Sequence, residues 1–260
     1  MVPGFPNFAG KHEHEGLISP RDIVSSIRDR EDLVIPDAVV LTYQGFLLEF
    51  LQERGDRRIE GYPSIFRDLY LARESSPIVA VVGGFGIGAP AASIVLEDLT
   101  AMGVRRFVSI GGAGSLQADC GFGQIVVCTS AIRDEGVSHH YLPAEKLIYP
   151  SKGLTQALAG ALRVRDIAFS EGPTWTVDAP YRETVAEARS YQAEGVVSVE
   201  MEAAALFAVA AYRGVEIASG FVITDTLAEE QWSHAFGSDL VRRASIELLE
   251  AAVEALETAG

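Results

Sequence analysis

Two glutamates stand in an otherwise apolar stretch, VVSVEMEAAALFAVAAYRGV, at residues 196–215. Glu200 and Glu202 flank Met201 where a run typical of a strand gives way to one typical of a helix. The lone pairs of a carboxylate match the two neighbouring hydroxyls of a ribose, and a methionine offers a soft apolar contact to the sugar face. Helix capping is the alternative for Glu202, because the helix dipole favours an acid at that position. The pair therefore indicates either a sugar site or a capped helix.

A third acid, Asp225, follows Thr224 at the end of an apolar run in the segment GFVITDTLAEE (220–230). A carboxylate at a strand end, next to apolar residues, can have a raised pKa and act as a general acid. The alternative is an aspartate that caps the following turn.

Two glycine-rich segments follow strand-like runs. In VAVVGGFGIGAPAASIVLEDL (79–99) the glycines keep Cβ atoms out of a turn, so that backbone N–H groups at a helix N-terminus can approach a ligand. In FVSIGGAGSLQADCGFGQIVV (107–127) a second strand ends in glycines, and Ser109, Gly112 and Ser115 could present donors to an anion or a sugar. Because ligands bind beyond the carboxyl ends of parallel strands, we expect both segments at one cleft.

The elements that must position these residues alternate along the chain. β-Branched runs predict strands at 37–43, 77–84, 105–112, 123–132, 165–172, 195–200 and 215–224. Helical periodicity lies at 89–103, 180–195, 201–214 and 237–260, and several of these segments end in glycine. The alternation predicts an α/β fold with a largely parallel sheet covered on both faces. We expect a turn-rich N-terminal arm over residues 1–20 and one domain over residues 21–260.

The composition excludes several classes of protein. The chain has 260 residues, 48% of them hydrophobic, and a formal net charge of −15. Such an acidic chain, with lysine only at Lys11, Lys146 and Lys152, argues against nucleic acid or an anionic membrane as partner. Its two cysteines, Cys120 and Cys128, favour core positions over a disulfide scaffold. With no transmembrane run and no secretory signal, we expect a cytoplasmic protein.

Five segments, taken together and in this order, resemble the nucleoside phosphorylase family, which includes uridine phosphorylase, hexameric purine nucleoside phosphorylase and methylthioadenosine nucleosidase. They are GFGIGAPAASIVLEDL, RRFVSIGGAGSLQADCGFGQIVV, TSAIRDEGVSHHYLP, VEMEAAALFAVAAYRGV and FVITDT. The resemblance implies a single-domain α/β/α sandwich with a mixed, partly barrel-like central sheet. It implies cleavage of the N-glycosidic bond of a nucleoside, without a metal or an organic cofactor. It also implies homo-oligomers built from dimers, commonly three in a hexamer.

The resemblance assigns roles to the acids. Glu202 would hold the ribose 2′- and 3′-hydroxyls, with Met201 under the sugar and Glu200 beside it. Asp225 matches the acid that protonates or hydrogen-bonds the purine ring nitrogen as the base leaves. Trp175 falls about where an aromatic side chain stacks on the base.

The site for the nucleophile departs from the family pattern. Gly86 and the backbone of Gly111 and Gly112 would line the pocket for phosphate or water. Phosphorylases of the family carry an arginine where this chain has Ser109, and a Gly-Asp-Pro turn with a following arginine where it reads VVLTYQGFLLEF (39–50). Losing bidentate guanidinium groups should weaken a phosphate site.

Three interpretations follow for the reaction. A phosphorylase would rebuild its anion site from Arg133, Arg182 or Arg67 together with backbone donors, using nucleoside and inorganic phosphate as substrates. A hydrolase would use water and would need a general base, for which Glu49 is a candidate. A nucleoside-binding or sensing protein on the same fold would do neither, because a fold alone does not fix chemistry.

The preference for the base is also open. Asp225 favours a purine, because pyrimidine-specific relatives lack an acid there and use a Gln–Arg pair. Arg182 is present in the base segment, but no glutamine lies in register with it. The run RDEGVSHHYLP looks most like uridine phosphorylases, although its histidines, His139 and His140, favour a structural role. His12 and His14 of the arm could reach a neighbour's sugar or remain solvated.

Overall fold

The structure, a computed structural model, describes residues 5–8, 10–28, 30, 33–60, 68–228 and 232–258. The strands are β1 (Ala38–Thr42), β2 (Arg57–Ile59), β3 (Asp68–Arg73), β4 (Val79–Gly83), β5 (Arg106–Ser115), β6 (Ile125–Asp134), β7 (Leu147–Ile148), β8 (Phe169–Val177), β9 (Ser198–Glu200), β10 (Glu216–Thr226) and β11 (Ser233–His234). The α-helices are α1 (Pro20–Arg28), α2 (Gly45–Arg54), α3 (Ala89–Met102), α4 (Ser138–Tyr141), α5 (Lys152–Val164), α6 (Val185–Ala193), α7 (Ala203–Arg213) and α8 (Asp239–Thr258). Two short 3₁₀ helices, η1 (Lys11–Glu13) and η2 (Pro180–Arg182), complete the described elements.

The strands of the described residues form one mixed sheet, in the order β11-β10-β6-β8-β9-β5-β1-β4-β3-β2, with β7 paired to β6 off this path. Strand β10 also pairs with β5 in parallel, so that β5, β10, β6, β8 and β9 close a ring. The parallel pairs β1–β4 and β1–β5 extend the sheet on one side of this ring. The expectation of a mixed, partly barrel-like sheet is confirmed.

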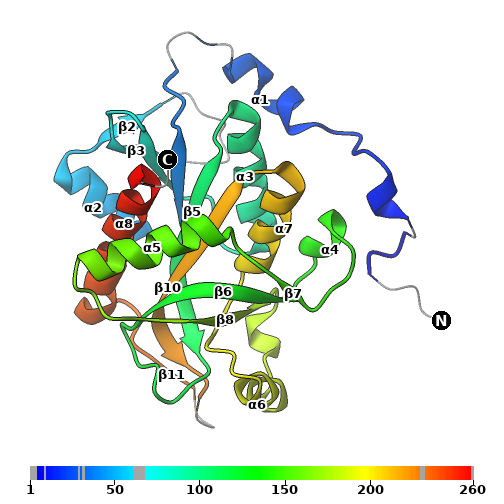
Figure 1. The fold of residues 1–260 in the computed structure, drawn as a ribbon, viewed down its shortest axis with the longest axis vertical. Helices are drawn as coiled ribbons and strands as arrows, with labels where there is room; N and C mark the ends of the chain where they lie inside the picture. Colours follow the sequence, from blue (N-terminus) through cyan, green and yellow to red (C-terminus); the bar gives the residue numbers. More distant parts are fainter. Residues whose placement is uncertain are drawn as a thin grey trace.

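Helices cover both faces of the sheet, as Figure 1 shows. Helices α3 and α7 pack on each other on one face, and α1 and α4 lie outside them. On the other face α5 packs on α8, and α8 contacts β10, β5 and β1. Each face buries its own hydrophobic cluster, so that the sheet lies between two apolar layers.

Helix α7 is the most buried of the helices that reach the ring. Its residues 203–210, AAALFAVA, are all buried, because small side chains let it pack closely on α3 and on strands β6 and β10. Gly214, at a φ of 67°, ends the helix in the left-handed conformation that glycine adopts without strain. The start of α7 is therefore held by packing along its length.

Several expectations about elements need correction. The glycines 111, 112 and 114 do not form a turn; they lie within β5, which pairs with β10 through Thr226↔Ser115 and with β9 at Gly114↔Val199. Strand β8 begins at Phe169, four positions after the expected start, and the helical segments expected above do not include α1, α2, α4 or α5. Cys120 and Cys128 are free and buried, as expected. Within the described residues, no helix is long and apolar enough to cross a membrane.

Candidate active site

A pocket of about 720 Å³ opens at the carboxyl ends of strands β1, β5, β9 and β10, and we call it the large pocket. This is the edge at which open α/β sheets bind ligands. Its lining comprises Tyr43, Gln44, Ile87, Gly112, Ala113, Gly114, Pro180, Tyr181, Glu183, Val199, Glu200, Met201, Glu202, Thr224, Asp225, Leu227, Trp232 and Phe236. Both glycine-rich segments contribute to it, through Ile87 and Gly112, so the expected single cleft is present.

Glu202 stands at the N-cap position of α7 but does not cap the helix with its side chain. One carboxylate oxygen, Oε1, accepts a hydrogen bond from the backbone N–H of Gly88 at 2.5 Å. The backbone N–H of Met201 is a second neighbour of this carboxylate. The carboxylate is nearly buried, and burial raises its pKa. Glu202 is thus fixed on one side and offers an acceptor to the large pocket on the other.

Glu200, the last residue of β9, is the acid that caps helix α7. Its Oε2 accepts from the backbone N–H groups of Glu202 at 2.8 Å and Ala203 at 2.7 Å, and its Oε1 accepts from the Thr176 hydroxyl at 2.6 Å. Burial raises the pKa of Glu200, and the neighbouring charge of Glu202 raises it further. Glu200 therefore holds the start of α7, and with it the backbone of Glu202.

Met201 lies between the two acids and faces the first glycine-rich segment. A Cβ atom added to Gly88 would lie 3.9 Å from the Met201 methyl carbon, so the two segments are in van der Waals reach of each other. Gly88 has a φ of 92°, which favours glycine and lets its N–H point at Glu202. Gly86 is exposed and does not line the large pocket, in which Ile87 takes that place.

Asp225 also lines the large pocket, near the end of β10. Its Oδ1 accepts from the Thr224 hydroxyl at 2.8 Å, and its Oδ2 accepts from the indole N–H of Trp232 at 3.0 Å. These two donors fix the carboxylate in one orientation. Asp225 and Glu202 thus come from different elements to the same pocket, as the sequence predicts.

The residue in place of the expected arginine, Ser109, lies behind a tyrosine. The hydroxyl groups of Ser109 and Tyr43 are hydrogen-bonded at 2.9 Å, and Ser109 is buried and does not line the large pocket. The Tyr43 ring lies against Gly111, where an added Cβ atom would approach it to 3.0 Å. Of the residues expected around the nucleophile, Gly112 lines the pocket, whereas Gly111 and Ser109 support Tyr43.

The arginines expected to rebuild an anion site lie elsewhere. Arg133 is buried, and its guanidinium donates to the Ser138 hydroxyl and to the carbonyl oxygens of Leu142 and Pro143, at 2.7 to 3.0 Å. It therefore fixes a loop and does not line the large pocket. Arg182 is exposed at the end of η2, also outside the lining. Both expectations are corrected by this placement.

Two further candidates for the nucleophile site are Arg67 and Glu49. Arg67 lies outside the described residues. Glu49, the candidate base for hydrolysis, is exposed on α2 and lines a different surface pocket, with Gln52 and Tyr70. Among the described lining residues of the large pocket there is no lysine, arginine or histidine, whereas four are acids.

Trp175 does not stack on anything in the large pocket. Its side chain is 1% exposed, its indole N–H donates to Asp134 at 2.9 Å, and its ring packs 4.9 Å from that of Tyr191. The next residue, Thr176, is the one that reaches the site, through its bond to Glu200. The aromatic residues of the lining are instead Tyr43, Tyr181, Trp232 and Phe236.

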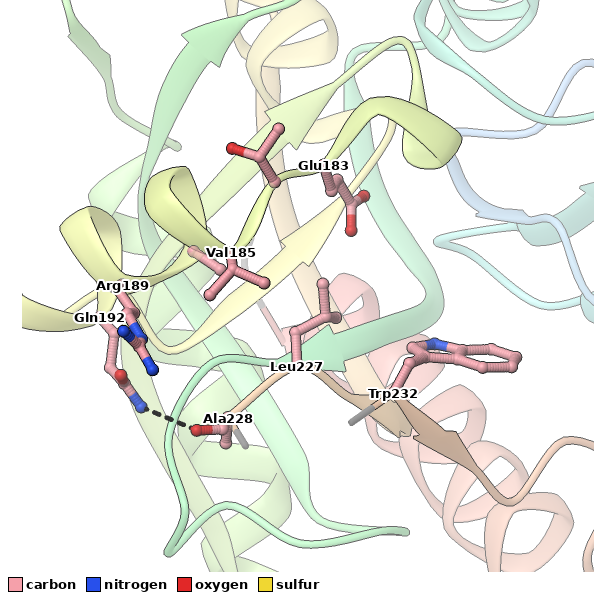
Figure 2. Close-up of a pocket in the computed structure, with 9 residues that line it drawn as sticks. Glu183, Val185, Arg189, Gln192, Leu227, Ala228 and Trp232 are labelled. Carbon is pink, nitrogen blue, oxygen red and sulfur yellow. Dashed lines mark hydrogen bonds between the residues drawn. The ribbon is translucent and has the colours of Figure 1, made fainter. Parts of the chain in front are cut away.

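The residues at the far end of the pocket were not predicted from the sequence. There Glu183, Leu227 and Trp232 also line a smaller chamber of about 200 Å³, which we call the side pocket. Figure 2 shows this chamber, with Arg189 and Gln192 of α6 opposite Trp232. Two features of the sequence could have pointed to these residues. One is Glu183, the acid that follows the run APYR, and the other is the aromatic run WSHAF (232–236).

Comparison with known proteins gives the family of the chain. A family model described as the phosphorylase superfamily matches residues 31–257. The chain belongs to this superfamily.

The names of three relatives specify different nucleosides. The chain is 36% identical over 130 residues to a guanosine phosphorylase of Halorubrum lacusprofundi, covering 50% of this chain and 54% of the relative. It is 30% identical over 165 residues to the uridine phosphorylase of Haemophilus influenzae, covering 57% of this chain and 66% of the relative. A DeoD-type purine nucleoside phosphorylase of Caldanaerobacter subterraneus is 30% identical over 153 residues, covering 56% and 64%. The matched parts thus span 54% to 66% of these relatives' own length.

The fold is also that of a solved structure. The purine nucleoside phosphorylase of Toxoplasma gondii, in complex with immucillin-H, superposes with a TM-score of 0.77 at 17% sequence identity. The match covers 86% of this chain and 91% of that one. It confirms the architecture described above.

Proposed function

We propose that the protein cleaves the N-glycosidic bond of a purine nucleoside with inorganic phosphate, releasing the free base and ribose 1-phosphate. The observation that carries this proposal is the convergence of Glu202, Met201 and Asp225 on one pocket. Membership of the phosphorylase superfamily supports the reaction class.

The sugar end of the pocket is suited to a developing positive charge. The available oxygen of Glu202 would accept the ribose hydroxyls, with Met201 against the sugar face. As the bond between C1′ and the base breaks, the sugar takes on oxocarbenium character, which nearby carboxylates stabilise more than the ground state. An oxygen of phosphate then bonds to C1′ from the opposite face.

The base end of the pocket is suited to a purine leaving group. The bond that breaks leaves its electron pair on the base, and a proton or a hydrogen bond at a ring nitrogen lowers the barrier. Asp225, held by Thr224 and Trp232, is placed to supply it. A pyrimidine has no equivalent of the imidazole-ring nitrogen, which is why we favour a purine.

A second candidate reaction is hydrolysis of the same bond. It is favoured by one observation: the described residues that line the large pocket include four acids and no basic side chain. The negative potential of these acids would repel a phosphate dianion, whereas water carries no net charge and would not be repelled. A cation from a neighbouring copy of the chain, in a dimer or in a hexamer of three dimers, would restore phosphorolysis.

The test is a panel of purine and pyrimidine nucleosides incubated with and without phosphate, with free base and sugar product quantified by chromatography. We expect purine release that requires phosphate and yields ribose 1-phosphate. Release of ribose without phosphate would establish hydrolysis instead. If no nucleoside loses its base under either condition, the proposal of an enzyme is wrong and a binding role is left.

A further inference from the structure

The β1 side of the large pocket lies opposite the end that Asp225 occupies. Strands β1 and β10 pair with β5 on its two edges; Asp225 lies on β10, and Tyr43 follows β1 directly. Tyr43 lines the pocket on the β1 side, and Glu202 lines it at the start of α7. With the base at Asp225 and the sugar at Glu202, a nucleophile that attacks C1′ from the face opposite the base approaches from the Tyr43 side.

The neighbours of Tyr43 hold its ring in one position. A Cβ atom added to Gly111 would lie 3.0 Å from the ring, and the Phe85 ring meets it edge-on with the two centroids 5.5 Å apart. The Tyr43 hydroxyl is hydrogen-bonded to that of Ser109 at 2.9 Å. The half-buried side chain therefore brings its hydroxyl to a fixed place at the pocket.

The surroundings of the two hydroxyls indicate which of them donates to the other. Ser109 is buried within β5, and in the described part of the chain Tyr43 is the one hydrogen-bond partner seen for its hydroxyl. If Tyr43 donated, the hydrogen of Ser109 would be buried without an acceptor, which is unfavourable. Ser109 therefore donates to the Tyr43 oxygen, and the phenolic hydrogen of Tyr43 is left to donate to a ligand.

The Tyr43 side of the pocket is also suited to an anion. Burial raises the pKa of the Tyr43 phenol well above its usual value, and the charge of Glu202 raises it further, so the hydroxyl keeps its hydrogen at neutral pH. Helix α2 begins at Gly45, and its N-cap residue Gln44, which lines the pocket, makes no capping hydrogen bond with its side chain. The N-terminus of α2 thus adds a partial positive charge beside Tyr43.

We propose that Tyr43 holds the phosphate nucleophile: its hydroxyl, oriented by Ser109, donates a hydrogen bond to a phosphate oxygen that does not attack C1′. This inference rests on the proposed cleavage with phosphate. A pair of neutral hydroxyls would then serve where the resemblance places an arginine of the phosphorylases, at position 109. Hydrogen bonds to a charged acceptor are about twice as strong as neutral ones, so a phenol can supply part of what a guanidinium would.

The experiment compares wild-type protein with Tyr43→Phe and with a control, Tyr149→Phe, which removes the same hydroxyl from an exposed tyrosine. With the purine nucleoside that the wild type cleaves fastest, KM is measured for phosphate and for the nucleoside, and the Kd of phosphate is measured by calorimetry. In Tyr43→Phe we expect KM and Kd for phosphate to rise by about 10- to 100-fold, the effect of a lost hydrogen bond to a charged group. KM for the nucleoside should stay within about twofold, and Tyr149→Phe should match wild type.

Ser109 is a positioning residue in this proposal, and two further variants test it. Ser109→Ala should raise KM for phosphate by about 3- to 10-fold, because the Tyr43 hydroxyl remains but is no longer oriented. The double variant should be no worse than Tyr43→Phe alone, since Ser109 acts through Tyr43. Additive losses would overturn this role of Ser109. Circular dichroism checks that each variant is folded, and Ser109→Ala carries the test if Tyr43→Phe is not.

The outcomes separate this inference from the proposed function. A phosphate KM in Tyr43→Phe within about twofold of wild type would overturn the role of Tyr43 and leave the reaction standing. Equal rises in both KM values would also overturn it, because the hydroxyl would then act on the nucleoside. A weaker phosphate Kd in Tyr43→Phe, with no turnover in wild type, would support Tyr43 and overturn the reaction. Wild-type protein that cleaves the nucleoside without phosphate and does not bind phosphate would overturn both.

Discussion

At the scale of single residues, two glutamates separated by one position have different surroundings. Glu200 ends a strand and turns its carboxylate to the free N–H groups at the start of α7, which satisfies donors that the helix itself cannot pair. Glu202 is then released from capping, and Gly88 from another segment holds one of its oxygens. Capping is thus realised by Glu200, whereas a sugar site at Glu202 stays a prediction.

We predict that Glu202→Gln lowers kcat/KM for the nucleoside by about 10- to 100-fold, the loss expected when a hydrogen bond to a charged group is removed. The amide oxygen can still accept from the Gly88 N–H, and the amide NH₂ then faces the ribose hydroxyls as a donor. Steady-state kinetics measure the loss. The melting temperature should not fall, because the substitution removes a buried charge.

The control for this variant is Glu216→Gln, the same change at the exposed start of β10, which should retain wild-type kinetics. A Glu202→Gln protein with unchanged kcat/KM would show that the carboxylate does not hold the sugar. One that loses activity only because it unfolds, as judged by circular dichroism, would assign Glu202 to folding.

The sequence could place Glu200, Met201, Glu202, Asp225 and Gly112 at one pocket, because local pattern and strand ends carry that information. It could not place Trp175. In the ring, Trp175 pairs with Val199 and Thr176 with Glu200, and successive strand residues point to opposite faces. The register of β8 therefore decides that a threonine, and not the tryptophan beside it, meets the acids.

Contacts with residues beyond the local pattern account for the other differences. Arg133 was a reasonable anion ligand by residue type, but its donors are used by the carbonyl oxygens of Leu142 and Pro143, nine and ten residues away. Glu183 and Trp232 reach the pocket only because η2 and the segment around β11 are brought to the same end of the ring. Contacts of this kind depend on tertiary structure and leave no spacing in the sequence.

At the scale of elements, strand β5 shows why glycines that look like a turn can belong to a strand. Pairing with β10 along its length and with β9 at its end keeps residues 111–115 extended. The glycines are required by close neighbours: an added Cβ atom at Gly112 would lie 2.8 Å from the Thr224 methyl group, and one at Gly114 would lie 2.8 Å from a Leu227 methyl group. The barrel is closed at this point without room for side chains.

We therefore predict that Gly112→Ala lowers kcat/KM by about 10-fold or more, because small misplacements of catalytic groups are costly. The added methyl group displaces Thr224, whose hydroxyl orients Asp225 at 2.8 Å. Stability should fall by about 1 to 3 kcal/mol, as for other overpacked sites. Kinetics and urea unfolding measure the two effects.

Gly121→Ala, in the connection between β5 and β6, is the matched control for this substitution, since an added Cβ atom there meets nothing within 4 Å. It should leave both activity and stability close to wild type. If Gly112→Ala were as active as Gly121→Ala, the contact between Gly112 and Thr224 would not be what orients Asp225.

At the scale of the whole molecule, acids held in the interior couple stability to pH. Burial, and then the charge of Glu97, raises the pKa of Asp98 to about 6, and burial raises that of Glu183 to about 7. Burial also raises the pKa values of Glu200 and Glu202. In the unfolded chain these groups return to ordinary values of 3.8 for aspartate and 4.5 for glutamate.

The sign of the effect follows from proton binding. Between the unfolded and folded pKa values the folded protein binds more protons, so the free energy of unfolding decreases as pH rises. The contribution is fully present below about pH 4 and is lost as pH rises through the folded values. His140 acts in the opposite direction, because burial, and then the charge of Lys11, lowers its pKa. Among the described residues, these four acids outweigh the one histidine, so the free energy of unfolding should decrease overall as pH rises.

We predict that the melting temperature falls between about pH 5.5 and pH 8.5 at constant ionic strength, as measured by circular dichroism. The net charge of −15 also opposes compaction, but salt screens exposed charges far more than buried ones. Raising NaCl from about 0.1 to 1 M should therefore raise every melting temperature and leave the slope with pH in place. Glu200→Gln, which removes one buried titrating group, should flatten the slope, and Glu216→Gln should not. A slope that vanishes in high salt would instead assign the pH dependence to repulsion at the surface.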